Sequence, residues 1–91
     1  MEKSTFSEDY GTILRALREQ RRASDLTQVQ VAARLGWTQT QVSKAERGER
    51  RLDLVELRSW CHALGVTLPY FVERLEPRLS RPPKHAIARG S

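Results

Sequence analysis

The sequence predicts an all-α protein that folds as a compact bundle of five short helices. Large apolar residues recur three or four positions apart through most of the 91 residues, which is the spacing of one helix face. No stretch alternates apolar and polar residues as a half-buried strand would. Three times a Thr or Asp stands three positions before a Gln or Glu, a capping pattern that satisfies free backbone N–H groups at helix starts. The length allows one domain with one modest core.

The first predicted helix follows a polar segment, residues 1–8, which we expect to be flexible. Its apolar stripe consists of Tyr10, Ile13, Leu14 and Leu17. The stripe runs to about Ala23, and the pattern is lost around residues 22–25, which predicts a loop. We expect the globular domain to occupy residues 9–76.

Two capping boxes, at Thr27–Gln30 and Thr38–Gln41, set the starts of the next two helices. Gly36 marks the bend between them, and Gly48 should end the second helix because glycine tolerates the left-handed conformation found there. Small or apolar residues at helical spacing are Val31, Ala32, Leu35, Trp37, Val42 and Ala45. This spacing closes two short helices over one core and predicts a helix-turn-helix over residues 28–47.

A third capping box, Asp53–Glu56, starts the fourth helix, which Gly65 ends. Its apolar face consists of Leu54, Leu57, Trp60, Cys61 and Leu64. Thr67, with Pro69 in the first turn, starts a short fifth helix. From residue 77 to residue 91 the chain is basic, contains prolines and has few large apolar groups, so we expect a flexible tail there.

The second helix of the helix-turn-helix leaves one polar face free. Its outer residues are Gln39, Thr40, Ser43, Lys44 and Arg47. Amide, hydroxyl and cationic groups on one face are what the base edges and phosphates of DNA require. The net charge of +5 also favours a polyanionic partner, although a genome rich in G and C would enrich arginine without a functional cause.

Other classes of function lack support in the sequence. Cys61 is the only cysteine, so no intrachain disulfide forms, and we expect a cytoplasmic, nucleoid-associated protein. No apolar run is long enough to suggest a membrane partner. His62 and His85 stand apart from other metal ligands, and no glycine-rich phosphate loop or nucleophile set occurs. We therefore expect neither a cofactor nor enzymatic activity.

The segment LTQVQVAARLGWTQTQVSKAERGERRLDLVEL resembles the Cro-type phage-repressor, or xenobiotic-response-element-like, family of helix-turn-helix transcriptional regulators. The match extends over residues 10–72 and rests on Gln28, on Ala32 and Gly36 at intervals of four, on Val42 six beyond, and on the run VSK-x-E-x-GERRLD. The resemblance implies a five-helix bundle of the phage-repressor type. It also implies a repressor that binds a palindromic operator on double-stranded DNA as a homodimer, with its third helix in the major groove.

The resemblance assigns roles to individual residues. The residues that it places at base edges are Gln39, Thr40, Ser43 and Lys44. Among these, Lys44 suits either guanine or a phosphate. The residues that it places along the sugar-phosphate backbone are Gln28, Thr38, Arg47, Arg50 and Arg51. A solvated polar face and a charged surface loop remain the alternatives for the two sets.

Further assignments concern structure rather than DNA. The resemblance makes Arg21 and Glu46 a partly buried ion pair between the first and third helices, with Arg18 replacing Arg21 if the intervening loop contains an insertion. The dimer contact would lie near the fifth helix. Its candidates, which would otherwise close the monomer core, are Tyr70, Phe71 and Leu75. The apolar spacing favours core positions for Trp37 and Trp60 over stacking platforms, and a buried, inert Cys61 over a redox sensor.

Three rival functions stay open at this point. The first is an antitoxin or adaptor whose main target is a partner protein, and the basic tail could fold on such a partner. The second is RNA binding, for which the sequence lacks interleaved aromatic residues and any RNA-module motif. The third is a small enzyme, for which no catalytic set is visible.

Overall fold

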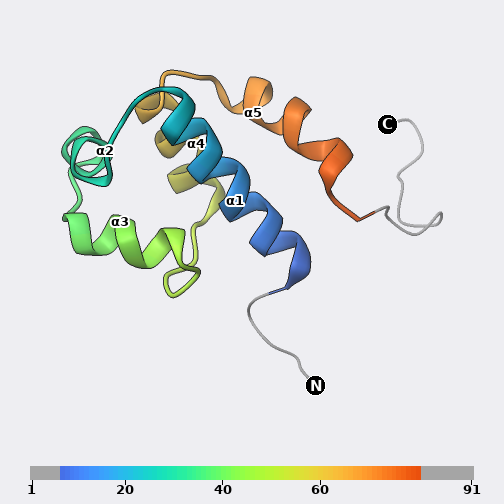
Figure 1. Ribbon diagram of the computed structural model, residues 1–91, viewed down its shortest axis with the longest axis horizontal. Coiled ribbons are helices and arrows are strands. Elements are labelled where there is room, and N and C mark those ends of the chain that lie inside the picture. Colours follow the sequence, from blue (N-terminus) through green and yellow to red (C-terminus); the bar gives the residue numbers. More distant parts are fainter. Residues whose placement is uncertain (1–6, 81–91) are drawn as a thin grey trace.

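The computed structural model describes residues 7–80, which form five α-helices and a short 3-10 helix (Figure 1). The elements, in order, are α1 (Glu8–Ala23), α2 (Gln28–Leu35), α3 (Gln39–Glu46), α4 (Leu54–Ala63), α5 (Leu68–Leu75) and η1 (Glu76–Arg78). The predicted all-α bundle is confirmed. Of the segments expected to be flexible, residues 1–6 and 81–91 lie outside the described residues.

Side-chain caps fix where the helices begin. The three predicted capping boxes are present with both halves formed, at the starts of α2, α3 and α4. Thr67 caps α5 by accepting a hydrogen bond from the backbone N–H of Tyr70 (3.2 Å). Ser7 caps α1 in the same way, so the first helix starts at Glu8 within the segment predicted to be flexible. Each cap satisfies a donor that a free helix end leaves unpaired.

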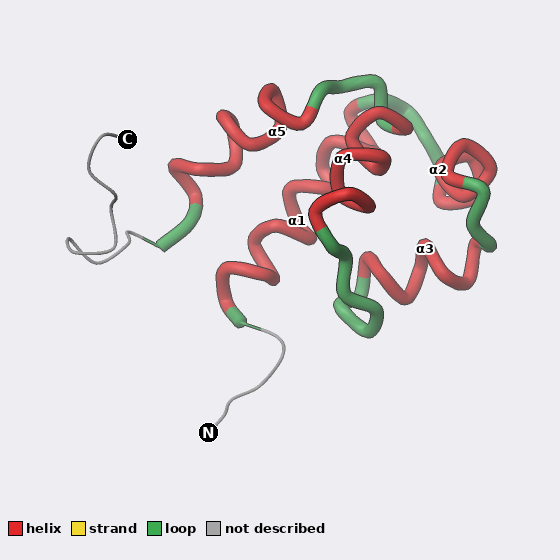
Figure 2. Tube along the Cα trace, turned by 180° about the vertical axis from the view of Figure 1, so that it is seen from behind, coloured by secondary structure: helices red, strands yellow, loops and turns green. Residues whose placement is uncertain are grey.

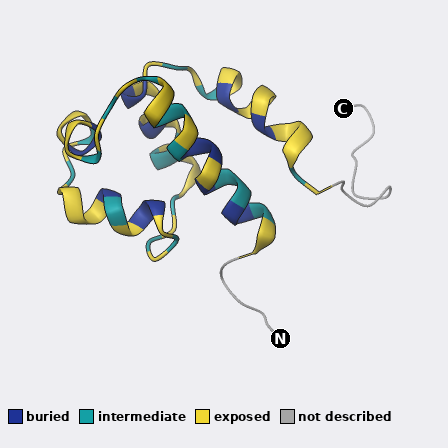
Figure 3. Ribbon diagram, viewed as in Figure 1, coloured by how far each residue is buried: buried dark blue, intermediate teal, exposed yellow. Residues whose placement is uncertain are grey.

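The core lies where α1, α2 and α4 meet. Figure 3 marks the buried residues of these helices in dark blue. The largest fully buried side chains are Trp60, Leu17, Val31, Val42 and Cys61. Trp37 packs edge-on against Trp60, with the ring centroids 5.6 Å apart. The two tryptophans therefore serve the core, as their spacing predicted.

Helix α5 completes the core rather than offering its apolar face to solvent. Phe71 and Leu75 are only 4% and 5% exposed, so these two predicted dimer residues belong to the monomer core. The amphipathic turn of α5 places both on the side that faces α1 and α4, while Tyr70 stays exposed at 44%. Their burial agrees with the alternative that the sequence left open, closure of the monomer core, while the dimer contact itself stays a prediction.

Residues 77–80, which the sequence assigned to a flexible tail, are part of the described fold. Residues 77–80 include the end of η1 and lie against α1, where Arg78 pairs with Glu19 (2.9 Å) and Ser80 bonds Asp9. Leu79 packs against the core. A single leucine and complementary charges are enough to hold these four residues, although their composition alone suggested a tail.

The helices form an elongated arrangement. Figure 1 and the reverse view in Figure 2 show α2 and α3 at one end, α5 at the other, and α1 running between them. The helix-turn-helix bends at Gly36, whose φ of 75° lies in the left-handed region that favours glycine. This arrangement leaves one side of α3 uncovered.

Candidate nucleic-acid interface

Helix α3 has one buried and one exposed side, as its polar spacing predicted. Val42, Ala45 and Glu46 are buried against the rest of the domain. The exposed side chains of α3 and its C-cap are Gln39, Thr40, Gln41, Lys44 and Arg47, and Ser43 is half-buried. Figure 3 shows exposed residues over the first turn of the helix. The predicted base-contacting set thus lies together on one helix.

Glu46 anchors the back of α3 through a buried ion pair with α1. Its carboxylate accepts hydrogen bonds from Arg21 Nε (2.7 Å) and Arg21 Nη2 (3.1 Å). The Arg21 side chain is 11% exposed and the Glu46 side chain is 2% exposed. Arg18 donates instead to the backbone carbonyl of Glu46 (2.7 Å), so both arginines hold α3 and only Arg21 pairs with the carboxylate. This bidentate geometry fixes the helix as well as neutralising the charge.

A third donor to Glu46 joins this buried pair to the exposed face. Gln28, the first residue of α2, donates from Nε2 to Glu46 Oε1 (2.9 Å). Its own Oε1 accepts from Nε2 of Gln39 (2.7 Å). A chain of hydrogen bonds therefore runs from Arg21 through Glu46 and Gln28 to Gln39. The family resemblance assigns Gln28 to a phosphate. The sequence did not reveal this link, because Gln28 lies 18 positions from Glu46 and 11 from Gln39.

The amide of Gln39 is oriented by this chain, whereas Thr40 and Lys44 make no side-chain hydrogen bond among the described residues. Thr38 is the N-cap of α3: its hydroxyl accepts from the backbone N–H of Gln41 (3.1 Å). Its backbone N–H donates to the Gln41 side chain (2.9 Å). Both halves of the capping box thus hold the first turn of α3, and the groups at its exposed face keep unused hydrogen-bonding capacity.

The loop after α3 begins with an exposed charge pair. Arg47 donates to Glu49 (2.9 Å) and also bonds the hydroxyl of Ser43. The hydrogen bond from Arg47 lowers the pKa of the Glu49 carboxyl below its ordinary value. Both members of the pair are about half exposed. Arg47 can exchange this partner for a phosphate at little cost, because exposed ion pairs contribute little to stability.

Arg50 and Arg51 each lie over an aromatic ring. The Arg50 guanidinium is 4.1 Å from the centre of the Trp37 ring and 3.0 Å from Glu56. The hydrogen bond from Arg50 lowers the pKa of the Glu56 carboxyl below its ordinary value. The Arg51 guanidinium is 4.3 Å from the centre of the Tyr10 ring. Arg50 is therefore half-buried and partnered, while Arg51 is exposed. Cation–π contacts of this kind hold the loop against the domain.

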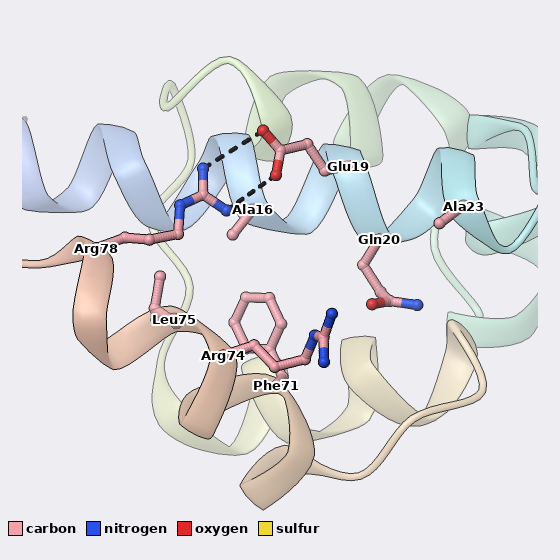
Figure 4. A pocket seen from close by; sticks show the side chains of 8 residues that line it. All are labelled: Ala16, Glu19, Gln20, Ala23, Phe71, Arg74, Leu75 and Arg78. Carbon is pink, nitrogen blue, oxygen red and sulfur yellow. Dashed lines mark hydrogen bonds and ion pairs between the residues drawn. The ribbon is translucent and has the colours of Figure 1, made fainter.

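Other features of the described residues bear less on nucleic acid. A groove of about 350 Å³ between α1 and α5 has Phe71 and Leu75 on its floor, with the Arg78–Glu19 pair at its rim (Figure 4). Cys61 is buried, and the loss of solvent raises the pKa of its thiol to about 11. Within residues 7–80 no group of acidic, histidine and cysteine side chains has the arrangement of a metal site, and no helix has the length and apolarity to cross a membrane.

Comparisons with known proteins agree with this geometry. A family model described as helix-turn-helix matches residues 17–71. An XRE-family like protein from Pseudomonas syringae pv. tomato str. DC3000 is 40% identical, with a TM-score of 0.73 over 77% of this chain and 85% of that protein. Two more distant structures share the fold. The restriction-modification controller protein C.Esp1396I is 24% identical (TM-score 0.73, 79% of this chain and 95% of that protein). The clp gene regulator ClgR from C. glutamicum is 23% identical (TM-score 0.70, 86% and 100%).

No curated protein matches the chain. The family model nevertheless covers more than half of the sequence, and the Pseudomonas structure is similar over most of both chains. Together with the exposed face of α3, these matches show that the chain belongs to the XRE family of helix-turn-helix proteins, which are DNA-binding transcriptional regulators.

Proposed function

We propose that this regulator is a repressor that binds a palindromic operator as a homodimer, with α3 in the major groove of each half-site. The exposed face of α3, where Gln39 donates a hydrogen bond to Gln28 of α2, carries the proposal. The distant relative C.Esp1396I supports it by analogy, because a tetramer of that protein has been solved in complex with its natural 35 base-pair operator. Regulators of this kind act by binding and are generally not enzymes.

Base reading would begin at the first turn of α3. Gln39 gives one N–H to Gln28, so its carbonyl oxygen and second N–H are left to meet adenine N6 and N7. Thr40 presents a methyl and a hydroxyl beside it, and Lys44 lies one turn along, where guanine or a phosphate is in reach. Ser43 contributes less, because it is half-buried and its hydroxyl already accepts from Arg47.

Backbone contacts would surround this reading face. Gln28 and Thr38 stand at the N-terminal ends of α2 and α3, where free N–H groups and the helix dipole favour a phosphate. Arg47 and Arg51 are exposed on the loop that follows α3. Arg50 must first leave Glu56 to reach a phosphate, so we expect it to shape the loop more than to bind DNA.

A dimer is part of the proposal because one recognition helix touches few base pairs. Two copies on half-sites about 34 Å apart double the contacts and match a two-fold protein to a palindrome. Of the residues considered for this contact, Tyr70 alone stays exposed, on the outer side of α5. Sedimentation of the full chain and of Tyr70→Ala at micromolar concentration tests this arrangement, and a parent chain that remains monomeric on its operator would exclude it.

Selection of bound DNA from a random pool, followed by titration at several salt concentrations, tests the function itself. We expect a palindromic consensus. Gln39→Ala and Lys44→Ala should each relax the preference at particular bases, at a cost of about 1 to 3 kcal/mol. Arg51→Ala should weaken binding to all DNA sequences alike, and it should reduce the slope of log affinity against log salt concentration by about one unit. Recovery of no consensus would refute sequence-specific binding, and equal effects of both kinds of variant would refute the division of roles. Loss of repression of a reporter gene on deletion of the consensus tests the sign of regulation.

A further inference from the structure

The groove between α1 and α5 is a concave surface apart from the exposed face of α3. Its volume of about 350 Å³ lies within the range of roughly 300 to 1,000 Å³ that small-molecule sites occupy. Phe71 and Leu75 of α5 and Ala16 of α1 form its apolar floor, and all three are buried. Ala23 lines the groove one end further along α1. The two alanines leave α1 without large side chains here, so the groove stays open.

The two ends of the groove differ in charge. At one end Arg78 and Glu19 neutralise each other through hydrogen bonds of 2.9 and 3.3 Å. Figure 4 shows Arg74 and Gln20 toward the other end. Among the described residues Arg74 has no carboxylate partner, and its guanidinium lies 5.1 Å from the centre of the Tyr70 ring. The groove therefore carries one uncompensated positive charge, at the end away from the ion pair.

Gln20 adds a second donor at this charged end. Its Nε2 donates one hydrogen bond to the hydroxyl of Ser24 (3.2 Å), which in turn donates to the carbonyl of Leu64 (3.0 Å). These bonds orient the amide, and its second N–H makes no hydrogen bond within residues 7–80. A guanidinium and an amide N–H at one end of an apolar groove suit a carboxylate group that continues into an apolar chain.

From this arrangement we infer that the groove binds a small amphipathic carboxylate. Its head group accepts hydrogen bonds from Arg74 and Gln20, and its apolar chain lies along Phe71 and Leu75. Binding is favoured at the head by charge-assisted hydrogen bonds and along the chain by removal of apolar surface from water. The inference does not depend on the proposed operator binding.

A second copy of the chain suits this groove less well. The centres of protein–protein interfaces are depleted in charged residues. Three charged side chains, those of Glu19, Arg74 and Arg78, line this groove. Tyr70, the exposed candidate for a dimer contact, is not among the lining residues. A small ligand leaves the three charges at the rim in contact with water, whereas a protein surface would cover them.

Helix α1 stands between the groove and α3. Arg18 and Arg21 bond Glu46 of α3 from one face of α1. At 3.6 residues per turn, Ala16 and Ala23 lie on roughly the opposite face, toward α5. A ligand in the groove therefore leaves uncovered the surface that we assign to DNA.

Isothermal titration of the full chain with octanoate tests this inference. The variants are Arg74→Gln, which removes the charge at the groove, and Ala23→Leu, which fills part of the groove from an exposed position. Arg58→Gln is the matched control, because it removes the same charge from an exposed position on α4 outside the groove. Chemical shifts of backbone amides locate the ligand by NMR, and thermal unfolding of every variant shows that the fold is kept.

The parent should bind a single octanoate, with the largest shift changes at Ala16, Phe71 and Leu75. Arg74→Gln should weaken binding by about tenfold, which is what a hydrogen bond to a charged group contributes. Octanamide should bind the parent with a similar loss, because it lacks the negative charge. Hexanoate should bind up to about 15-fold more weakly than octanoate, because each buried methylene contributes up to about fourfold. Ala23→Leu should also weaken binding, and Arg58→Gln should bind octanoate as the parent does.

Four results would overturn the inference. Equal losses from Arg74→Gln and Arg58→Gln would indicate a general charge effect. Equal affinities for octanoate and octanamide would remove the role of the carboxylate. Shifts of the groove residues that change with protein concentration in the absence of ligand would place a second copy in the groove. No saturable binding of octanoate by the folded parent would reject the site altogether, and it would leave the proposed function untouched.

Discussion

Replacement of Glu46 by alanine should strongly destabilise the domain. The change removes the acceptor of three hydrogen bonds, two from Arg21 and one from Gln28. It leaves the guanidinium of Arg21 with only the carbonyl of Leu26 (3.0 Å) and 11% of its side chain open to water. Breaking a buried pair by removing one partner costs about 3 to 5 kcal/mol. The partial exposure of Arg21 puts our expectation at the lower end, about 3 kcal/mol.

Urea and thermal unfolding followed by circular dichroism measure this cost. For a domain of this size, about 3 kcal/mol corresponds to a drop in Tm of roughly 12 to 24 °C. Glu49→Ala is the matched control, since it removes the same charge from an exposed pair three residues away and should hardly change the unfolding free energy. The double variant Arg21→Ala with Glu46→Ala should lose less than the sum of its parts, because no unpaired charge remains buried. If Glu46→Ala unfolds within about 1 kcal/mol of the parent, the reasoning is wrong.

Three further predictions follow from the charged loop and the core. Glu49→Gln should raise affinity for DNA, because it frees Arg47 from a carboxylate that competes with phosphate. The salt dependence of binding should fall only slightly. A titration that shows weaker binding than the parent contradicts this prediction. The pKa of Glu56 is lowered by Arg50, so its contribution to stability is present above the unfolded pKa of about 4.3 and is lost as the pH falls through the folded pKa. The unfolding midpoint of Glu56→Gln should accordingly fall less steeply than that of the parent as the pH is lowered. Parallel plots of midpoint against pH for the two proteins would argue against a stabilising Arg50–Glu56 pair. Cys61, with a pKa of about 11 and no exposure, should react with iodoacetamide at pH 8 only after unfolding; rapid labelling of the native protein would show otherwise.

Local chemistry made much of the fold predictable. The Thr27–Gln30, Thr38–Gln41 and Asp53–Glu56 boxes act within four residues, so their geometry follows from the sequence once a helix forms. Apolar spacing likewise identified most inner-face positions, including that of Trp60, but it was wrong for Leu54, which is 68% exposed at the first turn of α4. The polar face of α3 could be predicted for the same reason, because it consists of the positions on the side of the helix opposite the apolar residues.

Contacts between helices were harder to predict, because they depend on crossing angles that no short pattern contains. The place of Gln28 between Glu46 and Gln39 is one case, and the packing of Arg50 on Trp37 is another. A composition rule failed at residues 77–80, where one leucine and two polar contacts order a segment that is poor in apolar residues. The paired geometry of Arg21 and Glu46 was expected only through the family resemblance, not from spacing.

The hydrogen-bonded chain behind α3 also bears on how this regulator can diverge. We expect a single change at Glu46 or Arg21, its least exposed members, to cause a large loss of stability. The exposed positions Thr40 and Lys44 have no side-chain hydrogen bond within residues 7–80, and substitutions at such surface sites usually alter stability little. If α3 reads DNA as proposed, duplicated copies of the gene can acquire new operators through these two positions while the fold persists. Under the same proposal, a substitution at Gln28 would affect both operator preference and folding, because Gln28 bonds Gln39 as well as Glu46.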